Sequence, residues 1–242
     1  LMGQGYVRLD KIEVFVLDEA DRMLDMGFIH DIRRIVPALP QKRQTLLFSA
    51  TMPDDIVRIA TQYMKLPIRV EVARAGTAAE KVVQEIFIVR QESKRELLLK
   101  LLKQYHGSVL IFSRTKIGAQ KLTRALREAH HPAAEIHSDR SLGQRREALE
   151  GFKMGRYRIL VATDIAARGI DVKGIELVVN YDLPDDSENY VHRIGRTGRA
   201  GHEGRAISIA TPDQGSQVRD IERLMRTTLS VASHPEMPPA NF

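Results

Sequence analysis

The chain has 242 residues, 43% of them hydrophobic and 28% charged, which is typical of a globular protein with one large core or two smaller ones. Its 37 Lys and Arg exceed its 31 Asp and Glu, and this mild basic excess permits a polyanionic partner without requiring one. The absence of cysteine excludes disulfides and thiolate metal sites, and no apolar run reaches the ~20 residues of a membrane span, so we expect a cytoplasmic protein.

Strand-like and helix-like segments alternate in the early part of the chain. Ile12 to Leu17 is a short apolar run typical of a strand buried on both faces, and Thr45 to Phe48 is a second strand. A helix is predicted between them at Ile29 to Val36, and another from Pro53, because proline suits a first helical turn. Between residues 72 and 83 small residues and a glycine replace this pattern, which predicts a linker.

The later part of the chain is more regular. Strands are predicted at Val109–Phe112, Ala134–His137, Ile159–Ala162, Leu177–Val179 and Ala206–Ile209. Capping residues that mark helix starts are Ser93 with Glu96, Thr115, Ser141 with Gln144, and Ser187. An amphipathic helix follows Pro212 and precedes a mobile tail. Strands that alternate with helices in this way imply right-handed crossovers and a parallel sheet, hence an α/β fold.

Acidic side chains follow the first predicted strand, at Asp18, Glu19 and Asp21. The carboxyl ends of parallel strands are where α/β folds bind ligands. One such acid can hold Mg²⁺ through water while its neighbour orients an attacking water; an acidic strand-to-helix turn without chemistry is the alternative. Ser49 and Thr51 follow the next strand, where their hydroxyls either bond these acids or cap the following helix.

Basic side chains and glycines are concentrated in residues 190–201. His192, Arg193, Arg196 and Arg199 lie close together there, with glycines between them. A helix is expected to carry the first two arginines on one face and to end at the glycines. Because guanidinium forks match phosphate oxygens, the segment predicts a phosphate-binding site; a solvated basic face is the alternative.

A polar loop follows the predicted strand that ends at Ala162. Its Thr163, Arg168 and Gly169 offer a hydroxyl, a guanidinium and an exposed backbone, which suit a sugar-phosphate strand. The alternative is an ordinary loop with a helical pair between Asp164 and Arg168.

Taken in order, six segments resemble the motifs of the DEAD-box ATP-dependent RNA helicases, particularly bacterial members. The segments are 16–28, 49–51, 110–115, 162–171, 179–184 and 192–199. The resemblance runs from about Leu1 to Pro212 and implies RecA-like parallel sheets flanked by helices. It divides the chain into the C-terminal part of a first RecA-like domain at 1–71, a linker at 72–83, a complete second domain at 84–212, and a helix and tail at 213–242.

The resemblance implies catalytic roles at the matching positions. Asp18 should organise the Mg²⁺-bound phosphates of ATP, and Glu19 should position the hydrolytic water. Arg196 and Arg199 should act as arginine fingers on the γ-phosphate, with Asp171 near the nucleotide ribose.

Coupling and RNA-binding roles follow from the same resemblance. Asp21 is expected to link, with Ser49 and Thr51, to His192 across an interdomain cleft. Arg193 belongs to this coupling group and is expected to brace the segment after Ala162.

Four positions are expected to contact the RNA backbone without reading bases. They are Arg145, Thr163, Arg168 and Gly169. Leu142 departs from the family pattern, since it occupies a position where the family has glutamine. We expect a monomer that binds RNA and no membrane, and the sequence names no protein partner.

The largest departure is the absence of a Gly-x-x-x-x-Gly-Lys-Ser/Thr phosphate loop. The resemblance places that loop upstream of Leu1, so we expect a chain truncated at its N-terminus that hydrolyses ATP little or not at all by itself. Two alternatives stay open at this point: a catalytically incomplete RNA-binding module, and a related helicase that acts on DNA.

Overall fold

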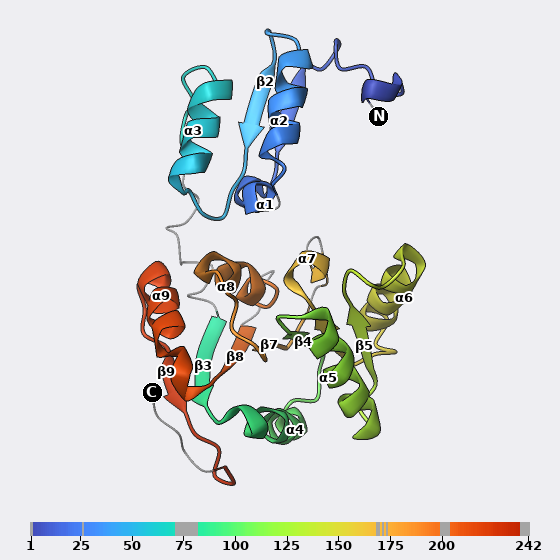
Figure 1. Ribbon diagram of the computed structural model, residues 1–242, viewed down its shortest axis with the longest axis vertical. Coiled ribbons are helices and arrows are strands. Elements are labelled where there is room, and N and C mark those ends of the chain that lie inside the picture. The colour runs from blue at the N-terminus through green and yellow to red at the C-terminus, as the bar shows by residue number, and fades with distance from the viewer. Residues whose placement is uncertain are drawn as a thin grey trace. The chain divides into compact units, whose positions relative to one another are not determined.

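The computed structural model describes residues 2–25, 27–70, 82–167, 170, 172, 174–198 and 204–237. The chain forms two compact units, Leu1–Ala75 (unit 1) and Gly76–Phe242 (unit 2) (Figure 1). Across the described ranges, no helix has the length and apolar character that crossing a bilayer requires.

Unit 1 contains two parallel strands with helices between and after them. The strands are β1 (Val14–Leu17) and β2 (Gln44–Leu47), and the helices are α1 (Ala20–Asp25), α2 (Ile29–Ile35) and α3 (Asp54–Tyr63), with 3₁₀ turns at Met2–Gln4 and Val36–Ala38. The helices pack on one face of the strand pair. The core of this face consists of Leu17, Ala20, Ile32, Val36, Ile56 and Ile59.

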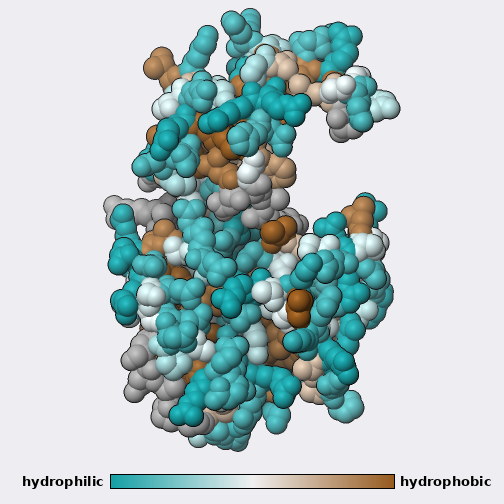
Figure 2. Space-filling view, viewed as in Figure 1, coloured by the Kyte–Doolittle hydropathy of each residue, from teal (hydrophilic) through white to brown (hydrophobic). Residues whose placement is uncertain are grey.

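The other face of this strand pair stays open. Val14, Val16 and Phe48 are 51%, 48% and 55% exposed, whereas Phe15 and Leu47 pack against the core. Successive strand residues point to opposite faces, so the exposed side chains share one face. In unit 1 as described, the first strand is therefore buried on one face and not on both. Figure 2 shows hydrophobic side chains at the surface of unit 1 among hydrophilic ones.

Unit 2 is built on a seven-stranded parallel sheet with the order β5-β6-β4-β7-β8-β3-β9. The strands are β3 (Val82–Ile88), β4 (Val109–Phe112), β5 (Ala133–Ile136), β6 (Ile159–Ala162), β7 (Leu177–Asn180), β8 (Gly204–Ala210) and β9 (Ser230–Ala232). The helices are α4 (Lys94–Gln104), α5 (Lys116–Glu128), α6 (Leu142–Lys153), α7 (Asp164–Ala167), α8 (Ser187–Ile194) and α9 (Gly215–Met225), with 3₁₀ turns at Gln91–Ser93 and Pro212–Gln214. The predicted α/β class, a parallel sheet flanked by helices, is confirmed.

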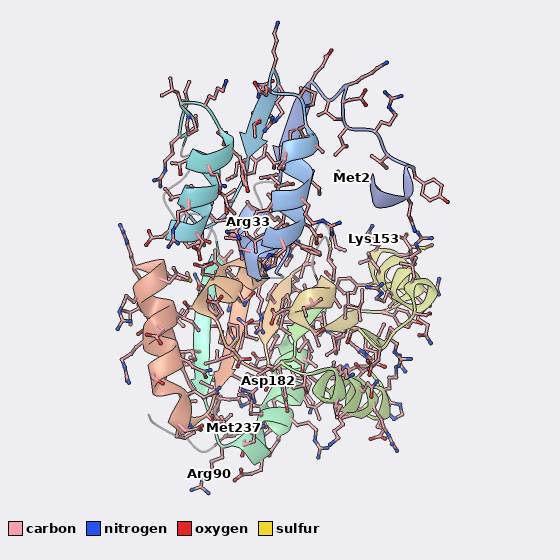
Figure 3. All side chains as sticks on the ribbon, turned by 45° about the horizontal axis from the view of Figure 1, so that its top comes forward. Met2, Arg33, Arg90, Lys153, Asp182 and Met237 are labelled. Carbon is pink, nitrogen blue, oxygen red and sulfur yellow. The ribbon has the colours of Figure 1, made fainter. Side chains whose placement is uncertain are left out.

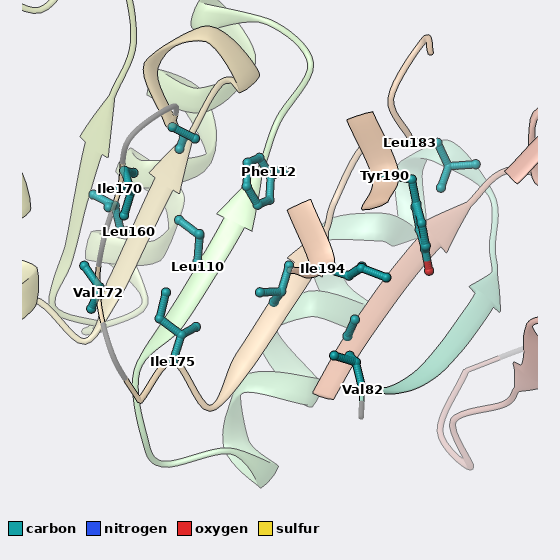
Figure 4. Packing of buried hydrophobic residues seen from close by; sticks show 14 of the residues in the cluster. Val82, Leu110, Phe112, Leu160, Ile170, Val172, Ile175, Leu183, Tyr190 and Ile194 are labelled. Atoms are coloured by element: carbon teal, nitrogen blue, oxygen red, sulfur yellow. The ribbon is translucent and has the colours of Figure 1, made fainter. Parts of the chain in front are cut away.

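Helices cover both faces of this sheet. The buried cluster on one face includes side chains of α6, α7, α8 and α9, and the cluster on the other face includes side chains of α4 and α5. Along β4, Leu110 and Phe112 join the first cluster while Val109 and Ile111 join the second, as the strand period of two requires. The central strands are thus buried on both sides, which explains their uninterrupted apolar sequences. Figure 4 shows part of the first cluster.

Both ends of unit 2 differ from the prediction. Val82 and Val83, assigned to the linker, begin β3 and align with Gly204 and Arg205 of β8. The rest of the predicted linker lies outside the described residues. The tail predicted to be mobile contributes β9, which pairs with β3, and its Met237 is 7% exposed. The final helix and tail therefore belong to unit 2, because they complete its sheet and core.

Two predicted helix caps are confirmed. The Thr115 hydroxyl accepts from the Gly118 amide at the start of α5. Ser141 and Gln144 form the predicted capping box at the start of α6, so the backbone there is fixed from both directions.

Two other predicted caps are wrong. The Ser93 side chain forms no capping bond, because residues 91–93 make a 3₁₀ turn that runs directly into α4. Helix α8 is capped by Asp186, whose carboxylate accepts from the Glu188 amide, one position before the predicted Ser187. Both residue types are good caps, so the sequence alone does not separate them.

Candidate functional site

Asp18 and Glu19 lie directly after β1 in unit 1. Asp18 is exposed, and its Oδ1 accepts a hydrogen bond of 3.0 Å from the Glu19 amide. Glu19 has a φ of 51°, a left-handed conformation that costs a non-glycine residue about 1–3 kcal/mol and persists only where the surroundings enforce it. No three metal-ligating side chains converge anywhere in the described ranges. A single exposed carboxylate fits a Mg²⁺ ion that keeps most of its water ligands.

The structure brings together Asp21, Ser49 and Thr51 at the carboxyl ends of β1 and β2. The Oδ2 of Asp21 accepts from the amide and the hydroxyl of Thr51, both at 2.8 Å. The Ser49 hydroxyl accepts from the Asp21 amide at 3.2 Å. Asp21 is 1% exposed and Thr51 is 7% exposed. The Thr51 hydroxyl therefore bonds the acid, whereas the Ser49 hydroxyl bonds its backbone amide. Helix α3 has Pro53 as its N-cap, without a side-chain capping bond.

The basic segment 190–201 contributes α8 and the turn that ends it. Helix α8 ends at Ile194 with Gly195 as its C-cap, so Arg196 lies in the turn and not on the helical face predicted for it. Arg196 is 8% exposed, and its Nη1 donates to the Ile170 carbonyl at 2.9 Å. His192 is partly buried on α8. Arg199 lies outside the described residues.

Arg193 is 1% exposed and is held by five contacts within unit 2. Its Nε and Nη2 donate to the two carboxylate oxygens of Asp164 at 2.6 and 2.7 Å. Its Nη1 donates to Asn180 Oδ1 at 3.2 Å and to the Asp182 carbonyl at 2.6 Å. The guanidinium carbon lies 5.0 Å from the centre of the Phe112 ring. Arg193 thus ties α8 to the segment after β6 by a bidentate ion pair, the strongest geometry available to arginine.

Two of the predicted RNA-contact residues lie in the described part of unit 2. Arg145 is partly buried at the end of the first turn of α6, and its Nε has no hydrogen-bond partner among the described side chains and backbone. Thr163 directly follows β6, and its amide donates to the Ile136 carbonyl at the end of β5. A buried guanidinium nitrogen without a partner is costly, and an incoming phosphate oxygen would satisfy it.

Three further predicted site residues lie outside the described residues. They are Arg168, Gly169 and Asp171.

Sequence reasoning missed a buried ion pair at the carboxyl ends of β4 and β7. Lys94 Nζ lies 3.0 Å from Asp182 Oδ1, and the two side chains are 2% and 20% exposed. Asp182 Oδ2 accepts from the Ser113 hydroxyl at 3.1 Å and from the Arg114 amide at 3.0 Å. In Figure 3 Asp182 lies toward the middle of unit 2. The carboxylate therefore holds the loop between β4 and α5 in place.

The surroundings of this pair shift both pKa values. Burial raises the pKa of Asp182, but the Lys94 charge, the Arg114 amide and the Ser113 hydroxyl together bring it below its ordinary value. Burial lowers the pKa of Lys94, and Asp182 offsets this only in part. The one sequence signal for the pair is an acid that follows the predicted strand Leu177–Val179 after two intervening residues, which is weaker than the signal at Asp18, directly after its strand.

Gly204 packs closely against the turn that follows α8. A Cβ at this position would lie 2.3 Å from the Gly198 amide nitrogen and 2.7 Å from the Thr197 hydroxyl. We expect Gly204→Ala to lower the free energy of unfolding of unit 2, measured in urea, by about 1–3 kcal/mol, because the backbone of the turn has to move. Gly143→Ala is the matched control, since a Cβ there meets only the Ser141 hydroxyl at 3.9 Å. Equal effects of the two substitutions would contradict the close approach.

Comparison with known proteins identifies relatives for both units. The family model DEAD/DEAH box helicase matches residues 2–59, and the model Helicase conserved C-terminal domain matches residues 93–201. The chain is 45% identical over 220 residues to the ATP-dependent RNA helicase DbpA of Bacillus subtilis, covering 90% of the chain and 46% of the relative. It is 43% identical over 237 residues to the DEAD-box ATP-dependent RNA helicase CshA of Geobacillus kaustophilus, covering 98% and 51%. The chain spans about half the length of these curated relatives.

The chain is also similar to solved structures of DEAD-box proteins. S. cerevisiae Dbp5 bound to RNA and ADP BeF3 is 32% identical with a TM-score of 0.86, over 96% of this chain and 62% of that one. E. coli DEAD-box protein SrmB, bound to regulator of ribonuclease activity A, is 34% identical with a TM-score of 0.62, over 65% of this chain and 94% of that one.

Proposed function

This chain belongs to the DEAD-box family of RNA helicases, and from that premise we propose that it supplies the RNA-gripping and arginine-bearing parts of an ATP-dependent enzyme that separates short RNA duplexes. The observation that supports this most is the ordered set of polar side chains at the strand ends of each unit. Asp21, Ser49 and Thr51 are bonded together in unit 1, and Arg193 is bonded to Asp164 in unit 2. Such groups are held in fixed geometry before any ligand binds, which is what binding of charged phosphates requires.

The nucleotide roles are assigned to residues from both units. Asp18 would hold Mg²⁺ through water, and Glu19 would orient the water that attacks the γ-phosphate. Arg196 and Arg199 would stabilise the charge on the transferred phosphoryl group, and Asp171 would accept from the ribose hydroxyls. Magnesium-bound ATP supplies the reactive phosphoryl group when it is present. Arginines in such positions are worth ~10³–10⁵ in turnover in related phosphoryl-transfer systems.

Communication between the units is assigned to Asp21, Ser49, Thr51 and His192. In this proposal Asp21 and its two hydroxyl partners form the unit 1 side of the contact, and His192 forms the unit 2 side. Arg193 serves the same function indirectly: its contacts within unit 2 hold α8, which carries His192, against the segment after β6.

RNA binding is assigned to Arg145, Thr163, Arg168 and Gly169. The unsatisfied Nε of Arg145 supports a phosphate contact at the start of α6. Groups of this kind contact the sugar-phosphate backbone and leave the bases unread, so the enzyme would bind RNA with little sequence preference.

A second candidate function applies to these 242 residues taken alone: an RNA-binding module without turnover. It is favoured by the absence of a Gly-x-x-x-x-Gly-Lys-Ser/Thr loop from the sequence, since that loop supplies the backbone donors and the lysine that hold ATP phosphates. We expect an ATPase assay of this chain to give background turnover with or without RNA. Turnover comparable to that of a complete DEAD-box relative, measured side by side, would refute the hypothesis of an RNA-binding module and support that of an active ATPase.

A further inference from the structure

A chain of hydrogen bonds between buried polar side chains crosses the core of unit 2. Arg193 Nη1 donates to Asn180 Oδ1 at 3.2 Å, and Asn180 Nδ2 donates to the Ser208 hydroxyl at 3.1 Å. Ser208 donates to the Tyr190 hydroxyl at 3.5 Å, and Tyr190 donates to Gln84 Oε1 at 3.1 Å. Each of the three middle groups accepts one bond and donates the next, so the bonds run head to tail. They join α8 to the strands β7, β8 and β3.

These groups lie in an otherwise apolar region. Asn180, Ser208 and Tyr190 are each 0% exposed. Tyr190 lies in the same hydrophobic cluster as Leu183 and Ile194 (Figure 4). Burial raises the pKa of Tyr190 to about 12, so its hydroxyl stays protonated and available as a donor. Consecutive hydrogen bonds in such surroundings strengthen one another, and a broken link leaves unpaired groups that cannot reach water.

The two ends of this series of hydrogen bonds lie at different places in unit 2. One end is Arg193, whose other nitrogens hold the Asp164 carboxylate next to Thr163. The other end is Gln84 of β3, the first strand of unit 2. Packing alone does not explain these residues, because apolar side chains of similar volume would fill the same space without needing matched donors.

We propose that Asn180, Ser208 and Tyr190 are positioning residues that set the orientation of the Arg193 guanidinium and, through it, of the Asp164 carboxylate. The link to RNA rests on the proposed function, in which Thr163 contacts the RNA backbone. RNA affinity then depends on side chains in the core that touch no RNA. Of the four hydrogen bonds from Arg193 to Gln84, which we call the network, the Ser208–Tyr190 bond is the longest, at 3.5 Å. The network is therefore most easily interrupted there.

The test uses the 242-residue chain with Tyr190→Phe and Ser208→Ala, each of which removes one hydroxyl and keeps the rest of the residue's packing. Tyr157→Phe is the matched control, since it removes a tyrosine hydroxyl bonded to Glu147 outside the network. Two quantities are measured for each variant that circular dichroism shows to be folded. They are the ¹⁵N side-chain Nε–H signal of Arg193 and the affinity for a fluorescein-labelled single-stranded RNA of mixed sequence.

We expect Tyr190→Phe and Ser208→Ala to shift the Arg193 signal, to speed its exchange with water and to weaken RNA binding by about fivefold or more. Tyr157→Phe should change neither quantity. An unshifted Arg193 signal in a folded Tyr190→Phe variant overturns the network, even if Ser208→Ala fails to fold. A shifted signal with unchanged RNA affinity overturns the link to the RNA site. If the unsubstituted chain binds no RNA, the proposed function fails, while the Arg193 signal still decides the network.

Discussion

Arg193→Ala should lower the free energy of unfolding of unit 2 by roughly 3–5 kcal/mol, measured as the shift of the urea transition. The substitution leaves the Asp164 carboxylate, 24% exposed, without its bidentate partner. It also leaves the Oδ1 of the fully buried Asn180 without the donor that Arg193 supplies. Since small domains are stable by about 5–15 kcal/mol in total, the variant should lie close to the unfolding threshold at room temperature.

An exposed arginine provides the control for this prediction. Arg124 on α5 pairs with Glu128 at 2.9 Å, but its side chain is 83% exposed. Surface pairs of this kind contribute less than about 1 kcal/mol, so Arg124→Ala should hardly move the transition. Arg193→Lys should be intermediate, since it keeps the charge and loses the planar fork. If Arg193→Ala cost no more than Arg124→Ala, the buried ion pair would have no structural importance.

Asp182→Asn is expected to have the second large effect, a loss of roughly 3–5 kcal/mol in the free energy of unfolding. The amide has nearly the same shape as the carboxylate, and its oxygen can still accept from the Arg114 amide. Its NH2 group then faces Lys94 Nζ, so the change removes both the negative charge and the acceptor of the Lys94 ammonium. Lys94, whose side chain is 2% exposed, is then left as a buried cation without its counterion. Adding Lys94→Met to Asp182→Asn should recover much of the loss, because it removes that unpaired charge. A double variant no more stable than Asp182→Asn would contradict this explanation.

The same pair predicts a dependence of stability on pH. The pKa of Asp182 in the folded protein lies below the ordinary value of 3.8 that it has in the unfolded chain. The folded state therefore binds this proton less readily, and the stability it contributes is present above about pH 4 and is lost as the pH falls through 3.8 toward the folded value. Between about pH 5 and pH 3 the unfolding free energy should fall more steeply for the unsubstituted chain than for Asp182→Asn. Parallel curves would show that Asp182 is not the group responsible.

Strands of unit 2 with four consecutive apolar residues were predictable from sequence, as Val109–Phe112 and Ile159–Ala162 show. Strand β3 was not predicted, because polar Gln84 and Glu85 interrupt its apolar residues and a segment typical of a linker precedes it. Strand β9 has three residues at the edge of the sheet, and its pairing with β3 depends on contacts far apart in the chain. Local pattern carries no information about such contacts.

In the candidate site, too, some residues were predictable from sequence and others were not. Asp21, Ser49 and Thr51 follow consecutive strands that pair in parallel, so their meeting at one edge was predictable once the strands were identified. Lys94 and Asp182 are 88 positions apart, and only the tertiary fold brings them together. The hydrogen bond between Ser208 and Tyr190 could not be predicted from sequence either, because a serine in a strand and a tyrosine in a helix carry no signal of their partners.

We propose that this chain binds the sugar-phosphate backbone of RNA and does not read bases. The direct test is a fluorescence anisotropy titration of the 242-residue chain with single-stranded RNAs of several sequences, repeated over a range of salt concentrations. We predict closely similar affinities for all sequences, and a linear fall of log K with log salt concentration at a slope of roughly −0.7 per phosphate contacted. Absence of binding at low salt, or tight binding to one sequence with little dependence on salt, would contradict the account.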